Sequence, residues 1–325
     1  MPTPRKQQVC LQATPYYHCI SRCVRRAYLC GVDKATNVSY EHRRGWIEQR
    51  LLFLAQVFCI DVCAYAVMSN HSHLVLHINK KKALQLTDRQ VVMRWHQVCK
   101  GTEITRQFET NGQVDVYQES TLKSSIGIYR KRLFDISWFM RLLNEPIARM
   151  ANAEDDCTGR FWEGRFTSQA LLDEAALLAC MAYVELNPIR AGKSKTPETS
   201  QYTSIKLRIE AALKKKQPQE LMTFDGGSND KLNGCLPFLL QDYIELVDLT
   251  GRSIRDKDSG YIDIHIPNIL TRLNISADNW LNLTTKFEIH FKGPVGQCAA
   301  LRYFCELQNR IRRPNLFSSR TLFGN

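Results

Sequence analysis

The sequence contains no stretch that is long and apolar enough to cross a bilayer. Its longest apolar runs, such as residues 51–57, are short and interrupted, whereas a spanning helix needs about 20 mainly apolar residues. The first residues, Met-Pro-Thr-Pro-Arg-Lys, have neither the apolar segment nor the small-residue cleavage site of a secretory signal. We therefore expect a soluble cytoplasmic protein.

No Cys-x-x-Cys pair occurs among the twelve cysteines. Cys19 and Cys23, and likewise Cys59 and Cys63, lie four positions apart in apolar, strand-like stretches, where a free cysteine behaves as a small hydrophobic residue. None of the usual zinc-ligand spacings is present, and a reducing cytoplasm disfavours disulfides. The cysteines therefore give little support to a structural zinc site or a disulfide framework.

Acidic residues are too few to balance the basic ones. The 32 Asp and Glu face 44 Lys and Arg, which leaves a net charge of +12. Basic clusters lie at residues 80–82, 130–132, 214–216 and 310–313. A polyanionic partner is the simplest reason for this excess, although a solvated basic surface that keeps the protein soluble would have the same composition.

The first 80 residues have the pattern of an α+β sheet. Residues 16–24 are rich in aromatic and β-branched side chains and predict a strand. Residues 41–57 have the spacing of an amphipathic helix. Residues 59–68 and 71–78 predict two more strands, joined by a turn at Ser69-Asn70. This order begins a ferredoxin-like antiparallel sheet with packed helices.

The middle of the chain predicts an insertion and then two helices. Residues 80–132 are polar and weakly periodic, as expected of an insertion or connecting subdomain. From Asp135 onward, apolar residues recur at helical spacing, and residues 159–172 read as a loop that leads into a strand. Asp173 is a suitable N-cap for a helix that continues to about residue 186, and Pro188 lies where we expect this helix to end.

His71 and His73 are the residues that most directly suggest a metal. Side chains alternate along a strand, so both imidazoles lie on one face, about 7 Å apart at the backbone. This arrangement suits two ligands of one ion, and His77 has the same parity. A polar sheet surface would show the same spacing.

Tyr183 and Asn187 are four residues apart and therefore share one face of the predicted helix. A tyrosine hydroxyl beside a divalent cation can attack a phosphodiester. A tyrosine that merely faces the core would occupy the same position. The proline after Asn187 disfavours helical dihedral angles at that residue.

Residues 160–166 interleave arginines with aromatic side chains. Arg160 and Arg165 could hold a phosphate backbone while Trp162 stacks on a base. Trp162 and Phe166 would serve equally well as core anchors.

Together these segments resemble the single-tyrosine HUH transposases, in particular the branch of REP-associated tyrosine transposases and their insertion-sequence relatives. The resemblance spans about residues 14–205, and its four segments occur in the order typical of the family. They are the first strand (17–22), the HUH strand (65–76, YAVMSNHSHLVL), the Trp-Glu-x-Arg signature (161–166) and the nucleophile helix (183–192, YVELNPIRAG). Ser72 departs from the family, which prefers an apolar residue between the two histidines.

The resemblance implies a mechanism and a set of site residues. Tyr183 would be the nucleophile, and His71, His73 and Asn187 would bind Mg²⁺ or Mn²⁺. The product would be a 5′-phosphotyrosine on single-stranded or hairpin DNA formed from imperfect palindromes. Whether the protein is a monomer or a homodimer stays open. The residues expected to contact DNA are Arg22, Arg25, Arg26, Arg160, Trp162, Arg165 and Arg190.

On this basis we expect an HUH domain at residues 1–205 that includes the insertion at 80–132. A basic helix and linker (206–236) and a mainly helical C-terminal region (237–325) would follow, the latter with a DNA-binding or regulatory function. Two other functions are compatible with the sequence. One is a non-catalytic DNA-binding protein, such as a repressor or an architectural protein, on the same fold. The other is a metal phosphodiesterase that uses water as its nucleophile.

Overall fold

A computed structural model describes residues 8–24, 30–32, 37–226, 234–255 and 268–324. The chain divides into two compact units, which we treat separately. The sheet unit comprises the described parts of residues 1–45, 62–77 and 160–325, and the helical unit comprises residues 46–61 and 78–159. No helix of the described residues is long and apolar enough to span a membrane.

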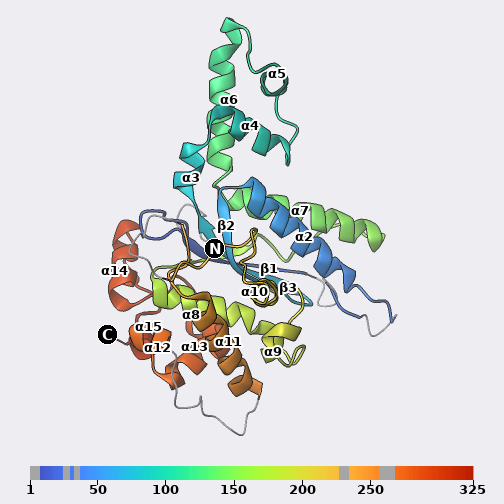
Figure 1. Cartoon of the computed structure of the whole chain (residues 1–325). Coiled ribbons are helices and arrows are strands. Elements are labelled where there is room, and N and C mark those ends of the chain that lie inside the picture. The colour runs from blue at the N-terminus through green and yellow to red at the C-terminus, as the bar shows by residue number, and fades with distance from the viewer. Residues whose placement is uncertain (1–7, 25–29, 33–36, 227–233, 256–267, 325) are drawn as a thin grey trace. The chain divides into compact units, whose positions relative to one another are not determined.

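Four strands form one sheet in the order β2-β3-β1-β4 (Figure 1). Their bounds are β1 (Tyr16–Arg22), β2 (Ile60–Val67), β3 (His71–Ile78) and β4 (Thr167–Leu171). β1 pairs antiparallel with both β3 and β4, and in sequence the helix α2 (His42–Val57) separates β1 from β2. This connectivity confirms the predicted α+β fold with a ferredoxin-like sheet.

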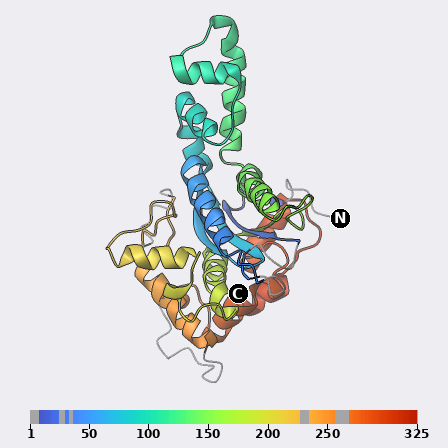
Figure 2. The ribbon, with the colours of Figure 1, turned by 90° about the vertical axis from the view of Figure 1, so that its right-hand side faces the viewer.

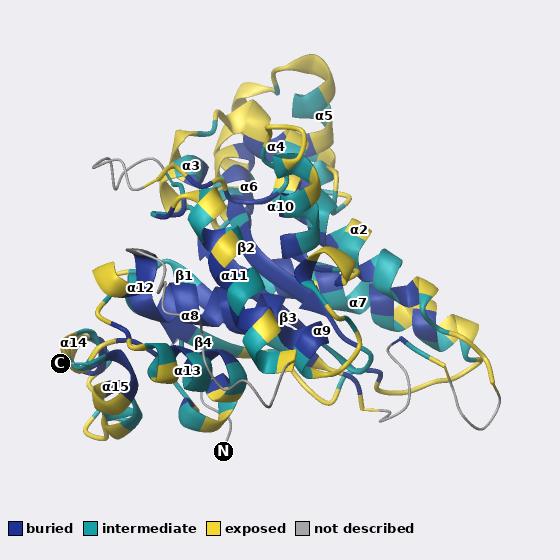
Figure 3. Ribbon diagram, turned by 60° about the horizontal axis from the view of Figure 1, so that its bottom comes forward, coloured by how far each residue is buried: buried dark blue, intermediate teal, exposed yellow. Residues whose placement is uncertain are grey.

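The helix α8 (Glu174–Glu185) is buried at every position from residue 175 to residue 185. Its sequence is apolar on all sides, and a helix of this kind must be covered on all sides. The sheet covers one side and α13 (Ala277–His290) packs against the other, while α11 (Leu240–Arg255) contributes to the same core (Figure 2). Burial is accordingly almost continuous along β2, β3 and α8 (Figure 3).

Both ends of α8 agree with the sequence pattern. The Asp173 carboxylate accepts a hydrogen bond from the Ala176 backbone N–H at 2.9 Å, which caps the first turn. At the other end the helix stops at Leu186, and Pro188 lies in the first turn of the short helix α9 (Asn187–Arg190). A proline is tolerated in a first turn because its missing N–H would have no partner there.

The C-terminal region is mainly helical, as predicted, and belongs to the same compact unit as the sheet. The remaining elements of the sheet unit are α10 (Ser204–Ala212), α12 (Asn268–Arg272), α14 (Cys298–Leu307), α15 (Leu316–Phe323) and the 3-10 helix η2 (Pro197–Thr199).

A buried polar cluster joins α8, α10 and α11. The Glu185 carboxylate accepts hydrogen bonds from the Ser204 hydroxyl at 2.9 Å and from the Ile205 backbone N–H at 2.7 Å. The Tyr243 hydroxyl donates to the same carboxylate at 3.5 Å. These bonds fix α8 against its neighbours and so fix the rotation of the helix about its axis.

The helical unit is built around α2 and α7 (Ile136–Glu154). The Arg50 Nε donates to the Leu142 carbonyl at 3.1 Å, and the Phe58 and Phe139 rings meet edge to face with centroids 5.4 Å apart. α7 buries the apolar positions expected from its periodicity, except that Met150 is 44% exposed.

Residues 80–132 contain more helix than their weak periodicity predicted. They form α3 (Lys80–Gln85), α4 (Asp88–His96), α5 (Glu103–Asn111), α6 (Glu119–Arg132) and the 3-10 helix η1 (Val116–Gln118). Thr87 and Thr102 each begin a capping box, at the start of α4 and of α5. These local start signals were present in the sequence even where hydrophobic periodicity was weak.

Candidate active site

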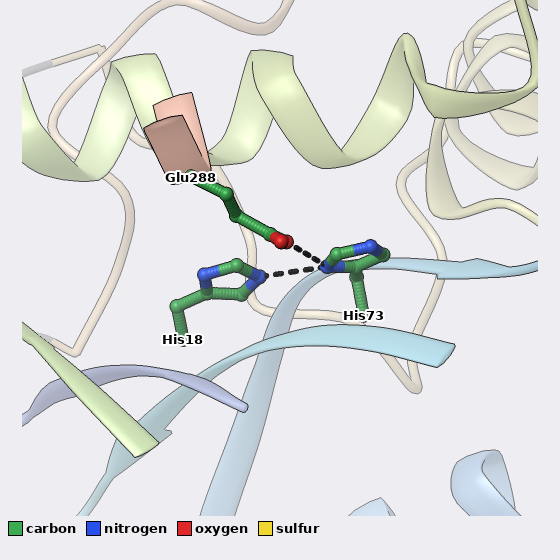
Figure 4. Close-up of side chains that lie close together, drawn as sticks. All are labelled: His18, His73 and Glu288. Carbon is green, nitrogen blue, oxygen red and sulfur yellow. Dashed lines mark hydrogen bonds and ion pairs between the residues drawn. The ribbon is translucent and has the colours of Figure 1, made fainter. Parts of the chain in front are cut away.

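Two histidines from adjacent strands meet a glutamate from α13. The ligand atoms of His18 (β1), His73 (β3) and Glu288 (α13) all lie within 4.8 Å of one another. His18 Nε2 is 3.0 Å from His73 Nδ1, and Glu288 Oε1 is 3.5 Å from the same nitrogen. Figure 4 shows the three side chains pointing toward one another. This cluster could hold a metal ion.

The chemistry of the donors fits a divalent cation. Burial lowers the pKa of His18 and of His73, so both rings are neutral at neutral pH, as metal ligation requires. Glu288 Oε1 is buried, and no described residue donates a hydrogen bond to it. A bound cation would offset the cost of burying this oxygen. Cis ligands about 2.1 Å from an octahedral ion are about 3.0 Å apart, which matches the distance between the two imidazole nitrogens.

His71 and His73 lie on one face of β3, as strand alternation predicted, with ring centroids 4.7 Å apart. The three-residue cluster includes His73 but not His71. His71 Nδ1 instead lies 2.6 Å from the Asn70 side-chain oxygen. Burial, with further contributions from Arg22 and Arg190, lowers the pKa of His71 to about 4. His77 lies four residues after His73 on β3 and packs against the Tyr16 ring.

Asn187 is buried at the start of α9, with 7% of its surface exposed. Its Nδ2 is also buried, and no described residue accepts a hydrogen bond from it. The predicted role of Asn187 as a metal ligand stays a prediction.

The fold brings Tyr183 to the histidines. Its ring centroid lies 5.9 Å from that of His73 and 6.4 Å from that of His18, and the ring stacks on Phe287 at 5.4 Å. Only 8% of its surface is exposed. Burial raises the pKa of Tyr183 to about 12; Glu288 raises it further, and the charge of Arg190 opposes the rise.

Arg190 lies against Tyr183. Its guanidinium carbon is 3.8 Å from the centre of the tyrosine ring, and Nη1 donates to the carbonyl oxygens of Tyr183 and Thr284 at 2.6 and 2.8 Å. Its predicted contact with DNA stays a prediction, since the structure places this guanidinium on the tyrosine.

Most other predicted DNA contacts lie around the end of β1. Arg22 is opposite His71 in the β1–β3 register, and the Arg22 carbonyl accepts from the Glu163 backbone N–H at 2.8 Å. The next residue, Cys23, forms a β-bridge with Trp162. This pairing places the segment with the exposed Arg160 and Arg165 beside Arg22. The remaining two, Arg25 and Arg26, lie outside the described residues.

Three residues of this site were not predicted from the sequence. His18 lies inside a segment that carried the family resemblance. It is a polar residue within a predicted strand, and the alternation of side chains along that strand is the signal that could have identified it. Glu288 and Gln169, which contacts His18, carried no local signal. Glu288 is 215 positions from His73, and Gln169 is a polar residue in a short strand, which is not a distinctive pattern.

No family model matches the chain, and no curated protein matches it. Among solved structures, the chain is similar to one described as a REP-associated tyrosine transposase bound to a REP hairpin. The TM-score is 0.38 and the sequence identity 10%, and the match covers 74% of this chain and 99% of the other.

Proposed function

We propose that this protein cuts and rejoins single-stranded or hairpin DNA through a covalent phosphotyrosine at Tyr183, with the help of a divalent metal. One observation carries the proposal: the Tyr183 ring lies 5.9 Å from His73, which belongs to a cluster with the donors of a metal site. A tyrosine beside such a cluster suits nucleophilic attack on a phosphodiester.

His18, His73 and Glu288 would hold the ion. His71, two residues before His73, and Asn187, four residues after Tyr183, are further candidate ligands. Imidazole and carboxylate together suit Mn²⁺, while Mg²⁺ is served mainly by oxygen ligands. When bound, the ion would offset the negative charge that develops on the phosphate oxygens.

In the first step the Tyr183 oxygen bonds to phosphorus while the bond from phosphorus to the 3′ oxygen breaks. The phenol loses its proton to solvent as the new bond forms. Arg190 favours the tyrosinate, because its positive charge lies against the ring. The departing 3′ oxygen takes up a proton. Attack by another 3′-hydroxyl on the phosphotyrosine reverses these changes and joins the new strand.

The DNA strand would approach along Arg22, Arg160, Trp162 and Arg165. Arginine with an aromatic side chain is a common combination for gripping phosphates while bases stack. These residues gather at the end of β1, which pairs with the strand that carries His71 and His73. The net charge of +12 agrees with a polyanionic partner.

The test is covalent adduct formation. Labelled hairpin DNA and Mn²⁺ are incubated with wild type, Tyr183→Phe and the double variant His18→Ala/His73→Ala, followed by denaturing gels. Tyr303→Phe, on an exposed tyrosine, controls for loss of a phenol. We expect an adduct with wild type and the control, and none with the other two. Cleavage without an adduct would instead indicate a hydrolase that uses water.

A non-catalytic DNA-binding protein is the second candidate. Its support is the enclosure of Tyr183, which is 8% exposed and has a pKa of about 12. This reading predicts hairpin binding that is unchanged by Tyr183→Phe or by removal of metal, with no cleavage under any condition.

A further inference from the structure

We propose that Gln169 is a positioning residue of this site, which fixes the tautomer of His18 so that the lone pair of Nε2 points toward His73 and Glu288. This inference deepens the proposed function, since it rests on a metal held by these three residues. It also makes the segment that follows α13 part of the site.

The orientation of the Gln169 amide is decided by two backbone carbonyls. Its Nε2 donates to the Phe291 carbonyl at 3.0 Å and to the Gly293 carbonyl at 2.7 Å. An amide is assigned from its hydrogen-bond network, and a flipped amide would set its oxygen against two carbonyl oxygens. The amide oxygen of Gln169 therefore faces His18.

The Gln169 oxygen lies 3.2 Å from His18 Nδ1. An amide oxygen only accepts, so His18 Nδ1 must donate. A neutral imidazole, the form that ligates a metal, carries one N–H. Its Nε2 is then the nitrogen with the free lone pair, and this is the atom that lies 3.0 Å from His73 Nδ1.

The sheet register fixes the contact between Gln169 and His18. Gln169 on β4 stands directly opposite His18 on β1, so the two side chains share one face of the sheet. Two rigid strands thus hold the donor and the acceptor, as expected of partners that orient metal-binding histidines.

The C-terminal segment contributes to the cluster in two ways. Glu288 supplies a donor directly, and the Phe291 and Gly293 carbonyls hold the amide that orients His18. A region without a counterpart in the sequence resemblance would therefore help to build the metal site.

The competing explanation is purely structural: Gln169 would attach residues 291–293 to the edge of the sheet and have no effect on metal binding. Two substitutions separate these roles. Gln169→Glu keeps an oxygen for His18 Nδ1 but cannot donate to the two carbonyls. Gln169→Met has similar length and can do neither. Gln97→Met, an exposed glutamine of the helical unit, controls for the substitution itself.

Binding of Mn²⁺ alone to the full-length chain, without DNA, is measured by calorimetry or electron paramagnetic resonance. We expect Gln169→Met to weaken binding about 10- to 100-fold, as loss of an outer partner of a metal ligand typically does. Gln169→Glu should retain more affinity than Gln169→Met, because its carboxylate can still accept a hydrogen bond from His18 Nδ1. Equal losses in both variants, or none in either, would overturn the proposal.

Nitrogen-15 NMR of the metal-free wild type gives a second readout that does not depend on how the variants fold. The proposal requires the proton of His18 on Nδ1, and a proton on Nε2 would refute it. The adduct assay keeps the two proposals apart. Suppose that wild type forms the adduct and that Gln169→Met binds Mn²⁺ as tightly as wild type. The proposed function would then be supported, and the positioning role of Gln169 would be refuted. A wild type that binds no Mn²⁺ would contradict both.

Discussion

The Arg190 guanidinium folds back onto the residue that lies seven positions earlier, Tyr183, 3.8 Å from the centre of its ring. The break between α8 and α9 makes this possible, since the chain leaves α8 at Leu186 and turns through Pro188 before Arg190. The tyrosine thus has a fixed cation against one face and the Phe287 ring stacked at 5.4 Å. A buried phenol beside a fixed positive charge is easier to ionise than one that is only buried.

Replacement of Arg190 should make Tyr183 a weaker nucleophile. The positive charge opposes the rise of the Tyr183 pKa to about 12, so Arg190→Gln should raise that pKa further. A rise of one unit lowers the tyrosinate fraction about tenfold at a fixed pH below the pKa. We therefore expect adduct formation to slow about tenfold at pH 7.5, with the pH–rate profile displaced to higher pH. Unchanged single-turnover rates between pH 6 and 9 would contradict this role.

Metal affinity should distinguish the cluster seen in the structure from the ligand set implied by the sequence. We expect His18→Ala, His73→Ala and Glu288→Gln each to weaken Mn²⁺ binding by more than about 100-fold, the upper end for loss of an outer partner. His71→Ala should cost less than about tenfold, because His71 lies outside the cluster.

Calorimetric titration of metal-free protein measures these affinities, with Glu306→Gln, a largely exposed glutamate, as the control. The reverse order, with His71→Ala more damaging than His18→Ala, would favour the set inferred from the sequence.

The stability of the fold should depend on pH through Glu185. Burial raises the pKa of Glu185 to about 7, from 4.5 for an ordinary glutamate. The folded state then keeps a proton that the unfolded chain releases between about pH 4.5 and 7, so the free energy of unfolding falls as pH rises through this window. The total loss is on the order of 3 kcal/mol.

Glu185→Gln should remove this pH dependence. Relative to wild type, the variant should gain stability between pH 5 and pH 8, as measured by urea unfolding. The buried histidines, whose pKa values are lowered, contribute the opposite slope to both proteins, and this contribution cancels in the difference. A difference that does not change with pH would mean that Glu185 is ionised throughout.

Phe287 should matter for catalysis beyond its contribution to packing. Phe287 and Phe304 are both buried phenylalanines of the C-terminal region, but only Phe287 stacks on Tyr183. We expect Phe287→Leu and Phe304→Leu each to cost about 1 kcal/mol of stability. Only Phe287→Leu should slow adduct formation, since it loosens the tyrosine ring. Equal rates for the two variants, compared in thermal melts and single-turnover assays, would show that the stacking is purely structural.

The salt dependence of hairpin binding should show how many arginines beside β1 contact phosphates. Arg160 and Arg165 are exposed, and each is expected to contact one phosphate. Replacing either with alanine should lower the slope of log affinity against log salt by about one. Fluorescence anisotropy between 50 and 300 mM salt measures this slope. Arg149→Ala, a largely exposed arginine of the helical unit, should leave the slope unchanged, and a decrease there would point to non-specific charge.

The sequence determined the features that depend on local periodicity. A period of two along β3 set His71 and His73 on one face, and the strand and turn signals predicted where the first three strands occur along the chain. The Asp173 cap and Pro188 marked the ends of α8. These features were predictable because each is decided by residues only a few positions apart.

Only the tertiary structure decided which side chains meet at the candidate site. His18 comes to His73 through the β1–β3 pairing, and Gln169 comes to His18 through the β1–β4 pairing. Glu288 arrives because α8 is apolar on all sides and α13 covers the side that the sheet leaves open. The energy that brings these residues together is the burial of α8, which is spread over many side chains. It therefore leaves no short-range pattern at residues 18, 169 or 288.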